Sequence, residues 1–150
     1  MRTGTSESIR LRWHASTGAR LARVGATRVT SFRDLEVWRL SMDLARRVYG
    51  ATASMPWPHR TELGGQMRRA SVSTPSNIAE GFRQGSLRAY LRHVRIAAGS
   101  AAELETKAEL ASDLNLWPEV EGTEIRAMAA RTGRMLTGLA LALEDRAGRP

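Results

Sequence analysis

Residues 87–114 read LRAYLRHVRIAAGSAAELETKAELASDL, and this stretch decides the fold class. Its apolar side chains recur every three or four residues, which is the spacing of one face of an α-helix. The residues of this face are Leu87, Leu91, Val94, Ala98, Ala101, Leu104, Ala108 and Ala111. Ser86 stands directly before the stretch as an N-cap residue, and the predicted helix is roughly 40 Å long at about 1.5 Å per residue. Such a helix must bury its apolar face against other helices.

Three further helices are expected around it. The four expected helices span residues 31–54, 61–81, 87–114 and 123–145. Ser31 and Asp34 form an Asp variant of the capping box at the start of the first helix. Gly81 is expected to end the second helix in the left-handed conformation. The short connections predict an all-α fold, an up-down antiparallel four-helix bundle over residues 31–146.

Charge is spread unevenly along the chain. The net charge is +8, yet residues 1–30 hold six arginines against one glutamate, a net +5. Serine, threonine, glycine and alanine are scattered among these arginines without an apolar period, so residues 1–30 are expected to form a basic flexible tail. Three interpretations of this segment stay open: a nucleic-acid-binding arm, a segment resembling an organelle transit peptide, and translation from an upstream start codon.

The sequence shows no pattern of a catalytic or metal-binding site. It has no cysteine, which excludes disulfides and thiolate-bound metals. None of the three histidines follows a glutamate by three positions, as a di-iron bundle requires. We also find no hydrolase elbow and no dinucleotide fingerprint. We expect a protein that is not an enzyme and takes no cofactor. No apolar run reaches the ~20 residues of a membrane span, so a cytoplasmic location is expected.

Four sequence blocks between residues 32 and 106 form an ordered pattern. They are FRDLEVW at 32–38, QMRRASVS at 66–73, PSNIAEGF at 75–82 and GSxxELET at 99–106. The pattern resembles the 23S rRNA intervening-sequence protein family, bacterial four-helix bundles related to the accessory variability determinant proteins of diversity-generating retroelements. The resemblance implies a homopentamer and, through the retroelement relatives, binding of nucleic acid and a partner protein. Trp57-Pro58-His59 departs from the family, which usually carries acidic residues there.

Seven residues of these blocks are candidates for a structural role. They are Gln66, Asn77, Glu80, Gly81, Gly99, Glu103 and Glu105. Asn77 and Glu80 are expected to hydrogen-bond to neighbouring helices, and a recognition role for the same segment stays open. Gly99 lies among small residues, which would let another backbone approach closely.

Arginines of the bundle are the candidate nucleic-acid contacts, because guanidinium groups bind phosphate in a bidentate manner. The candidates are Arg68, Arg69, Arg83, Arg88, Arg92 and Arg95. Three of them, Arg88, Arg92 and Arg95, share one face of the third helix at i, i+4 and i+7. For at least one of Arg68 and Arg69 we favour the alternative, an ion pair with a glutamate of the bundle such as Glu80, Glu103 or Glu105.

The end of the fourth helix is apolar on nearly every side over residues 136–143, which indicates a subunit interface. We therefore expect a non-enzymatic homo-oligomer that contacts RNA or DNA phosphates through its arginines. The alternative is a scaffold that docks a protein partner on this helix and uses its arginines only for solubility. Burial of Arg88, Arg92 and Arg95 in carboxylate pairs would favour that alternative.

Overall fold

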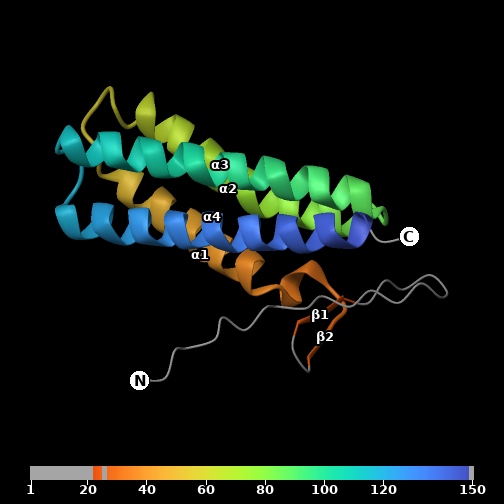
Figure 1. Ribbon diagram of the computed structural model, residues 1–150. Helices are drawn as coiled ribbons and strands as arrows, with labels where there is room; N and C mark the ends of the chain where they lie inside the picture. The colour runs from red at the N-terminus through yellow and green to blue at the C-terminus, as the bar shows by residue number, and fades with distance from the viewer. Residues whose placement is uncertain (1–21, 25–26, 149–150) are drawn as a thin grey trace, which may run out of the picture.

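The computed structural model describes residues 22–24 and 27–148 of the chain. Four long helices run up and down in one antiparallel bundle (Figure 1). They are α1 (Glu36–Ala53), α2 (Leu63–Arg83), α3 (Leu87–Asp113) and α4 (Glu119–Ala147). Each helix packs against its neighbours in sequence, and α1 also packs against α4, which closes the bundle. The predicted four-helix fold is confirmed. Among the described helices, none has the length and apolar character needed to cross a membrane.

Two short strands lie within the segment that was predicted to be a flexible tail. β1 (Ala22–Val24) pairs antiparallel with β2 (Thr27–Val29). Val29 is only 2% exposed and packs in the core, so the packed part of the chain starts before Ser31. The rest of the predicted tail, residues 1–21 and 25–26, lies outside the described residues.

The predicted capping box is present, but it caps a short 3-10 helix, η1 (Phe32–Asp34), and not α1. Ser31 Oγ accepts a hydrogen bond from the Arg33 N–H at 3.2 Å, and the Asp34 carboxylate accepts one from the Ser31 N–H at 2.8 Å. Backbone N–H groups of Thr30 and Ser31 stabilise the ionised form, which lowers the pKa of the Asp34 carboxyl below its ordinary value. The box therefore fixes the turn that leads into α1.

Gly81 does not end α2, and the prediction that it would was wrong. The helix continues to Arg83, and the left-handed backbone lies at Gly85, whose φ is 76°. Gly81 is buried where α2 meets α3. A Cβ on Gly81 would lie 2.6 Å from the Cβ of His93 and 3.0 Å from the Cδ2 of Tyr90. The glycine is required by the close approach of two helices and not by a turn.

α4 begins at Glu119 and not at Thr123, where the sequence placed its start. Pro118 occupies the N-cap in an extended conformation, and Glu119 and Glu121 follow in the first turn. Carboxylates at this end of a helix interact favourably with its dipole. Gly122, which was assigned to the preceding turn, is buried within the helix.

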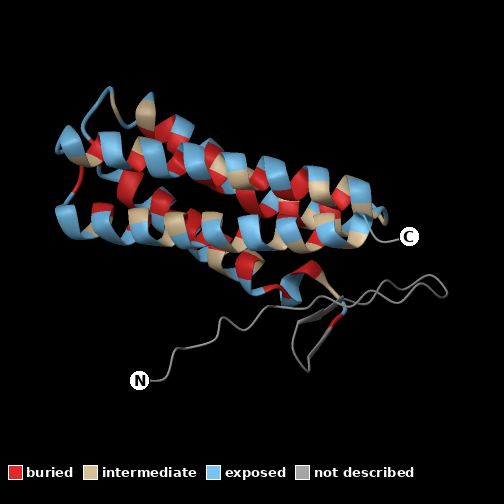
Figure 2. Cartoon of the chain, in the orientation of Figure 1, coloured by how far each residue is buried: buried red, intermediate tan, exposed pale blue. Residues whose placement is uncertain are grey.

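The core forms two apolar layers along the bundle, and Figure 2 shows the buried positions lining its interior. The first layer includes Val29, Phe32, Leu35, Ile78, Tyr90, Val94, Leu136 and Leu143. The second includes Leu44, Val48, Met67, Leu104, Ala108, Trp117 and Ile125. We call the end with the first layer the motif end, where η1 meets the α2–α3 loop. The opposite end, at residues 112–124, is the turn end.

Several apolar side chains at the end of α4 are buried in the core of this fold. Leu136, Ala140 and Leu143 are buried in the first core layer, which also contains Val29 and residues of η1. Leu141 alone among the leucines of residues 136–143 is well exposed, at 60%. The apolar pattern of residues 136–143 is therefore explained inside one chain, and the inference of a subunit interface there loses its basis.

Candidate nucleic-acid interface

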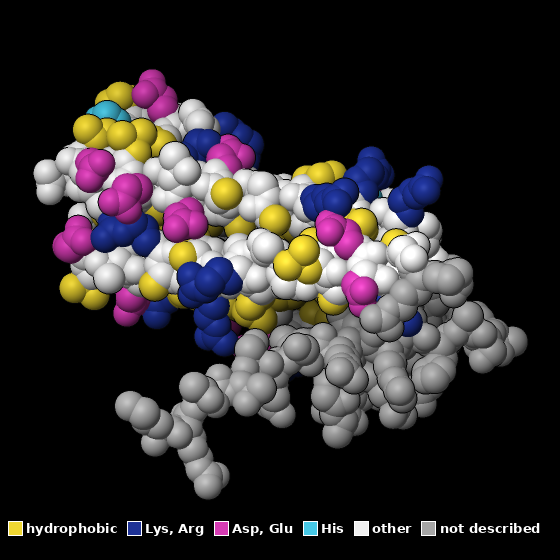
Figure 3. Space-filling view, viewed as in Figure 1, with side chains coloured by type: hydrophobic (Ala, Val, Ile, Leu, Met, Phe, Trp, Pro, Cys, Tyr) yellow, Lys and Arg dark blue, Asp and Glu magenta, His cyan; other side chains and the backbone are white. Residues whose placement is uncertain are grey.

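The basic face predicted on α3 is exposed at the motif end. Arg88, Arg92 and Arg95 are all solvent-exposed on this helix. Together with Leu91 and Ile96 they line a surface depression of ≈ 490 Å³. In Figure 3, dark blue side chains project at the motif end beside a few magenta ones, and magenta side chains are denser at the turn end, where dark blue ones also occur. The three arginines therefore lie on the same accessible surface.

Partners of these arginines differ. Within the described part of the chain, Arg88 has no hydrogen-bond or ion-pair partner, and Arg92 reaches only the imidazole of the adjacent His93 at 3.5 Å. Arg95 donates to Glu144 Oε1 of α4 at 2.6 Å, with 61% of its side chain still exposed. None of the three is buried in a carboxylate pair, which was the condition that would have favoured a scaffold.

Arg83 has a different local role. It is exposed at the end of α2, and its guanidinium carbon lies 5.4 Å from the ring centroid of Phe32. Arg33 approaches the same ring at 4.5 Å. The Arg83–Phe32 cation–π contact attaches η1 to the end of α2, whereas the Arg33–Phe32 contact lies within η1 itself. Arg83 is therefore close to the basic face in the chain but is engaged by an aromatic ring.

A buried histidine network links α2 to α3 behind the basic face. His93 is 5% exposed, and its Nδ1 lies 3.0 Å from Asn77 Oδ1. Asn77 Nδ2 donates to the carbonyl of Ser73 at 2.9 Å, so Oδ1 is the acceptor and His93 Nδ1 carries the proton. His93 Nε2 is then free to accept from Gln84 Nε2 at 3.0 Å. The expected contact of Asn77 with a neighbouring helix is confirmed.

His93 was not among the predicted site residues. Its spacing from Tyr90, Ala97 and Ala101 places it on the buried side of α3, and that spacing is the signal that could have found it. Glu80 is exposed, with its carboxylate 3.8 Å from His93 Nε2. The network positions the start of α3, and with it the first turns that carry the arginines.

Arg68 is half-buried at the surface of the bundle, and its hydrogen-bond partners do not include a carboxylate. It donates to Thr52 Oγ1 at 2.9 Å and to the Arg60 carbonyl at 3.3 Å, and it lies 5.9 Å from the Tyr49 ring centroid. The predicted partner class was therefore wrong, because the C-terminal end of α1 supplies the hydroxyl and the ring at this position. Arg68 acts as a link between α1 and α2.

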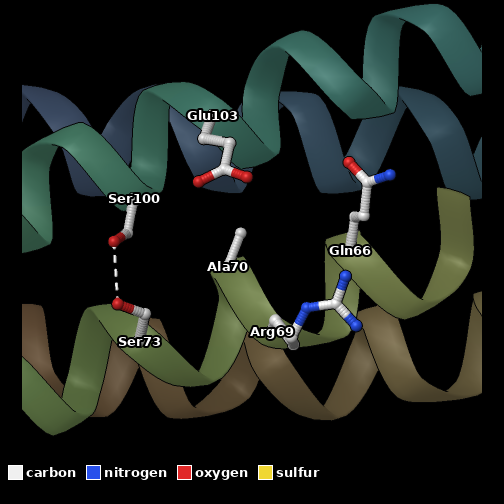
Figure 4. Close-up of a pocket in the computed structure, with 6 residues that line it drawn as sticks. All are labelled: Gln66, Arg69, Ala70, Ser73, Ser100 and Glu103. Carbon is white, nitrogen blue, oxygen red and sulfur yellow. Dashed lines mark hydrogen bonds between the residues drawn. The ribbon is translucent and has the colours of Figure 1, made fainter.

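Arg69 points into a groove between α2 and α3 (Figure 4). The groove has a volume of ≈ 350 Å³ and is lined by Gln66, Arg69, Ala70, Ser73, Ser100 and Glu103. Ser73 and Ser100 close one side of it through a hydrogen bond of 2.9 Å. Glu103 pairs with Lys107 one turn further along α3, so Arg69 has no partner among the described residues.

The remaining motif residues face solvent. Glu105 is exposed and has no partner among the described residues. Gly99 is exposed as well, and a Cβ on it would meet no atom within 4 Å. The close backbone approach expected at Gly99 does not occur within one chain.

The chemistry of the basic face is that of an anion-binding surface. No three His, Asp or Glu side chains in the described ranges gather in a way that could hold a metal ion. The only tyrosine near the face is Tyr90, whose burial raises the pKa of its phenol far above the ordinary value, so this group stays neutral. Three exposed guanidinium groups remain, and groups of this kind pair with phosphates or carboxylates.

Comparison with known proteins places the chain in a family. No curated protein matches it. A solved structure with the same fold is a protein of unknown function from the S23 ribosomal protein family of Bacteroides thetaiotaomicron VPI-5482, with 19% sequence identity and a TM-score of 0.63. The match covers 69% of this chain and 97% of that one. The sequence pattern of the 23S rRNA-intervening sequence protein family matches residues 33–138, which is most of the bundle. The chain therefore belongs to the 23S rRNA-intervening sequence protein family.

Proposed function

We propose that this protein is a non-catalytic nucleic-acid-binding protein that contacts RNA or DNA phosphates through the basic face of α3. One observation carries the proposal. Residues 87–98 contain three arginines and no acidic residue, and two of the three have no carboxylate partner among the described residues. Exposed arginines without partners are available to phosphates, and such contacts carry little sequence information.

The turn end shows that unpaired arginines are not a general property of this surface. Arg126 contacts Glu109 at 3.2 Å and Glu119 at 2.8 Å, and Arg47 pairs with Glu124. Arg47 and Arg126 are thus neutralised by carboxylates at the turn end, whereas Arg88 and Arg92 at the motif end have no carboxylate partner among the described residues. This difference supports a polyanion as the ligand of the motif end.

The proposal includes a cytoplasmic homo-oligomer, and the resemblance to pentameric relatives gives its number as five. The α2–α3 side supports assembly, since Gly99 is uncovered and Val72 is 42% exposed there. Several copies of the basic face on one ring would bind a polyanion with higher avidity than a single copy. Light scattering on the purified full chain should give five times the chain mass of 16.5 kDa. A monomer in this measurement would contradict the assembly.

The test of binding replaces two unpaired arginines in the full chain. R88Q/R92Q keeps helix propensity and removes two phosphate contacts. Anisotropy of a labelled RNA duplex, titrated between ~50 and ~200 mM salt, should show a log–log salt slope shallower by about 1.8 than in wild type. The matched control is R46Q/R47Q on α1, which removes two exposed arginines that already have carboxylate partners. Wild-type protein that does not retain the duplex at ~50 mM salt would overturn the proposal.

A second candidate function rests on the floor of the depression. Leu91 is half-buried and Ile96 is 44% exposed between the arginines, and an acidic protein segment with apolar side chains would fit both features. This candidate is a scaffold that binds a protein partner and not nucleic acid. Failure to retain the duplex, together with capture of acidic amphipathic peptides that depends on Ile96, would favour it.

A further inference from the structure

The third arginine of the basic face is the one that a carboxylate holds. Glu144 Oε1 lies 2.6 Å from Arg95 NH2, and this ion pair connects α4 to α3 across the edge of the face. The Arg95 side chain is 61% exposed and the Glu144 side chain 39% exposed, so solvent reaches both groups. An exposed pair of this kind contributes little to folding, because water and salt screen it.

Glu144 stands at an unfavourable place for a carboxylate. It lies in the last turn of α4, where the negative end of the helix dipole repels an anion. The C-terminus of α4 is capped by the backbone, since the Gly148 N–H donates to the carbonyl of Glu144 at 3.1 Å, so the Glu144 side chain is not required for capping. The local role of the carboxylate is therefore its contact with Arg95.

We propose that Glu144 is an internal competitor for phosphate, which holds Arg95 in the free protein and releases it when nucleic acid binds. This inference rests on the proposed function. A phosphate offers the same bidentate acceptor geometry as the carboxylate and a denser negative charge along the strand. Exchange of one anion for the other breaks only a weak exposed ion pair. Glu144 thus sets the affinity of the face below the value that three free arginines would give.

The experiment compares E144Q with wild type in the full chain, on the same RNA duplex. Glutamine keeps the size of the side chain and removes its charge. We expect binding that is about two- to five-fold tighter at ~50 mM salt, the factor that a screened ion pair can contribute. The salt slope should change little, because Arg95 contacts a phosphate in both complexes and the number of counterions released from the duplex stays the same.

The matched control is E36Q. Glu36 forms an exposed inter-helix pair with Arg131 at 2.6 Å, on a different side of α4. The E36Q variant has the same change of net charge as E144Q and should tighten binding of the duplex by much less. In a double-mutant cycle, R95Q should abolish the gain from E144Q, because the released arginine is then missing.

Three outcomes decide the inference. Equal tightening by E144Q and E36Q would overturn it and leave the proposed function standing, since only net charge would then matter. A gain from E144Q that is undiminished in the R95Q background would overturn it as well. Wild type and E144Q that both fail to retain the duplex at ~50 mM salt would overturn the proposed function and this inference together.

Discussion

Both ends of the bundle bring helices close together at a buried glycine, but the polar groups around the glycine differ between the two ends. At each end a glycine is buried in a helix beside bulky side chains, Gly81 at the motif end and Gly122 at the turn end. A hydrogen-bond network surrounds each glycine. At the motif end it is built from an imidazole and two amides, and at the turn end from Arg126, Ser112, Trp117 and carboxylates.

This difference decides what the arginines can do. The turn end uses Arg126 to connect Glu109 on α3 with Glu119 on α4, so its cation is neutralised. The motif end connects α2 with α3 through hydrogen bonds of His93 with Asn77 and Gln84, without an arginine–carboxylate pair between these two helices. Arg88 and Arg92 therefore stay on the surface without a carboxylate partner among the described residues.

The largest expected effect distinguishes the two buried glycines. Gly81→Ala should lower the free energy of unfolding by about 3 kcal/mol, because the new methyl group overlaps the Cβ of His93, which cannot move without its helix. Gly122→Ala should cost less, about 2 kcal/mol, since the atom that it meets most closely is the Ser112 hydroxyl, which can rotate away, so that only the buried Trp117 indole must shift. Urea denaturation measures both.

The control for these two variants is Gly50→Ala in α1. No atom lies within 4 Å of the added methyl group, so the gain in helix propensity should stabilise the chain by up to ~1 kcal/mol. Equal losses for Gly81→Ala and Gly122→Ala would show that the two helix contacts are equally tolerant. The distinction between rigid and adaptable packing would then be wrong.

A medium effect compares the two polar networks. His93→Ala should lower the free energy of unfolding by about 2 kcal/mol, because it opens a cavity and leaves Asn77 Oδ1 without its donor. Ser112→Ala should cost about 1 kcal/mol, since it removes one half-buried acceptor of the Trp117 indole N–H. A loss for Ser112→Ala that matches or exceeds the loss for His93→Ala would contradict this ranking.

The smallest effect is a pH dependence at the turn end. The hydrogen bond from Arg126, and then that from Thr123, holds the pKa of Glu119 below its usual value of 4.5. A depressed folded-state pKa means that the contribution is complete above the unfolded pKa and is lost as the pH falls through the folded one. The difference in unfolding free energy between wild type and R126Q should therefore narrow from about pH 6 to about pH 3.

Asp34 provides the internal comparison for this titration. The pKa of its carboxyl is lowered mainly by the backbone N–H groups of Thr30 and Ser31, which R126Q does not touch. Its acid-induced loss of stability should be the same in both proteins. A difference between wild type and R126Q that stays constant across this pH range would rule out the Arg126–Glu119 contact as a source of stability.

Local patterns predicted the elements of the fold well. Ser86 caps α3 with its hydroxyl, as expected, and the apolar spacing of α3 corresponds to its buried face. The exposed arginines of α3 were also identified from their spacing. These features depend on residues close in sequence, whose relation in a helix is known in advance.

Features that depend on the position of a neighbouring helix could not be predicted from the sequence. A glycine suits both a helix end and a tight helix contact, and only the position of His93 shows that Gly81 serves the second purpose. Arg68 could not be assigned to Thr52, because that contact requires the relative position of α1 and α2. For the same reason the pairing of Arg95 with Glu144 was not foreseen.

The charge pattern of α3 has a consequence for how the molecule approaches a ligand. Residues 87–98 carry three arginines and no acid, whereas residues 103–113 carry four acids and one lysine. The helix is thus an electric dipole along the long axis of the bundle, in addition to the dipole of its peptide groups. Near a polyanion this dipole experiences a torque that turns the motif end forward. At physiological salt the torque acts only within about 8 Å, so the orientation is corrected in the last step before contact.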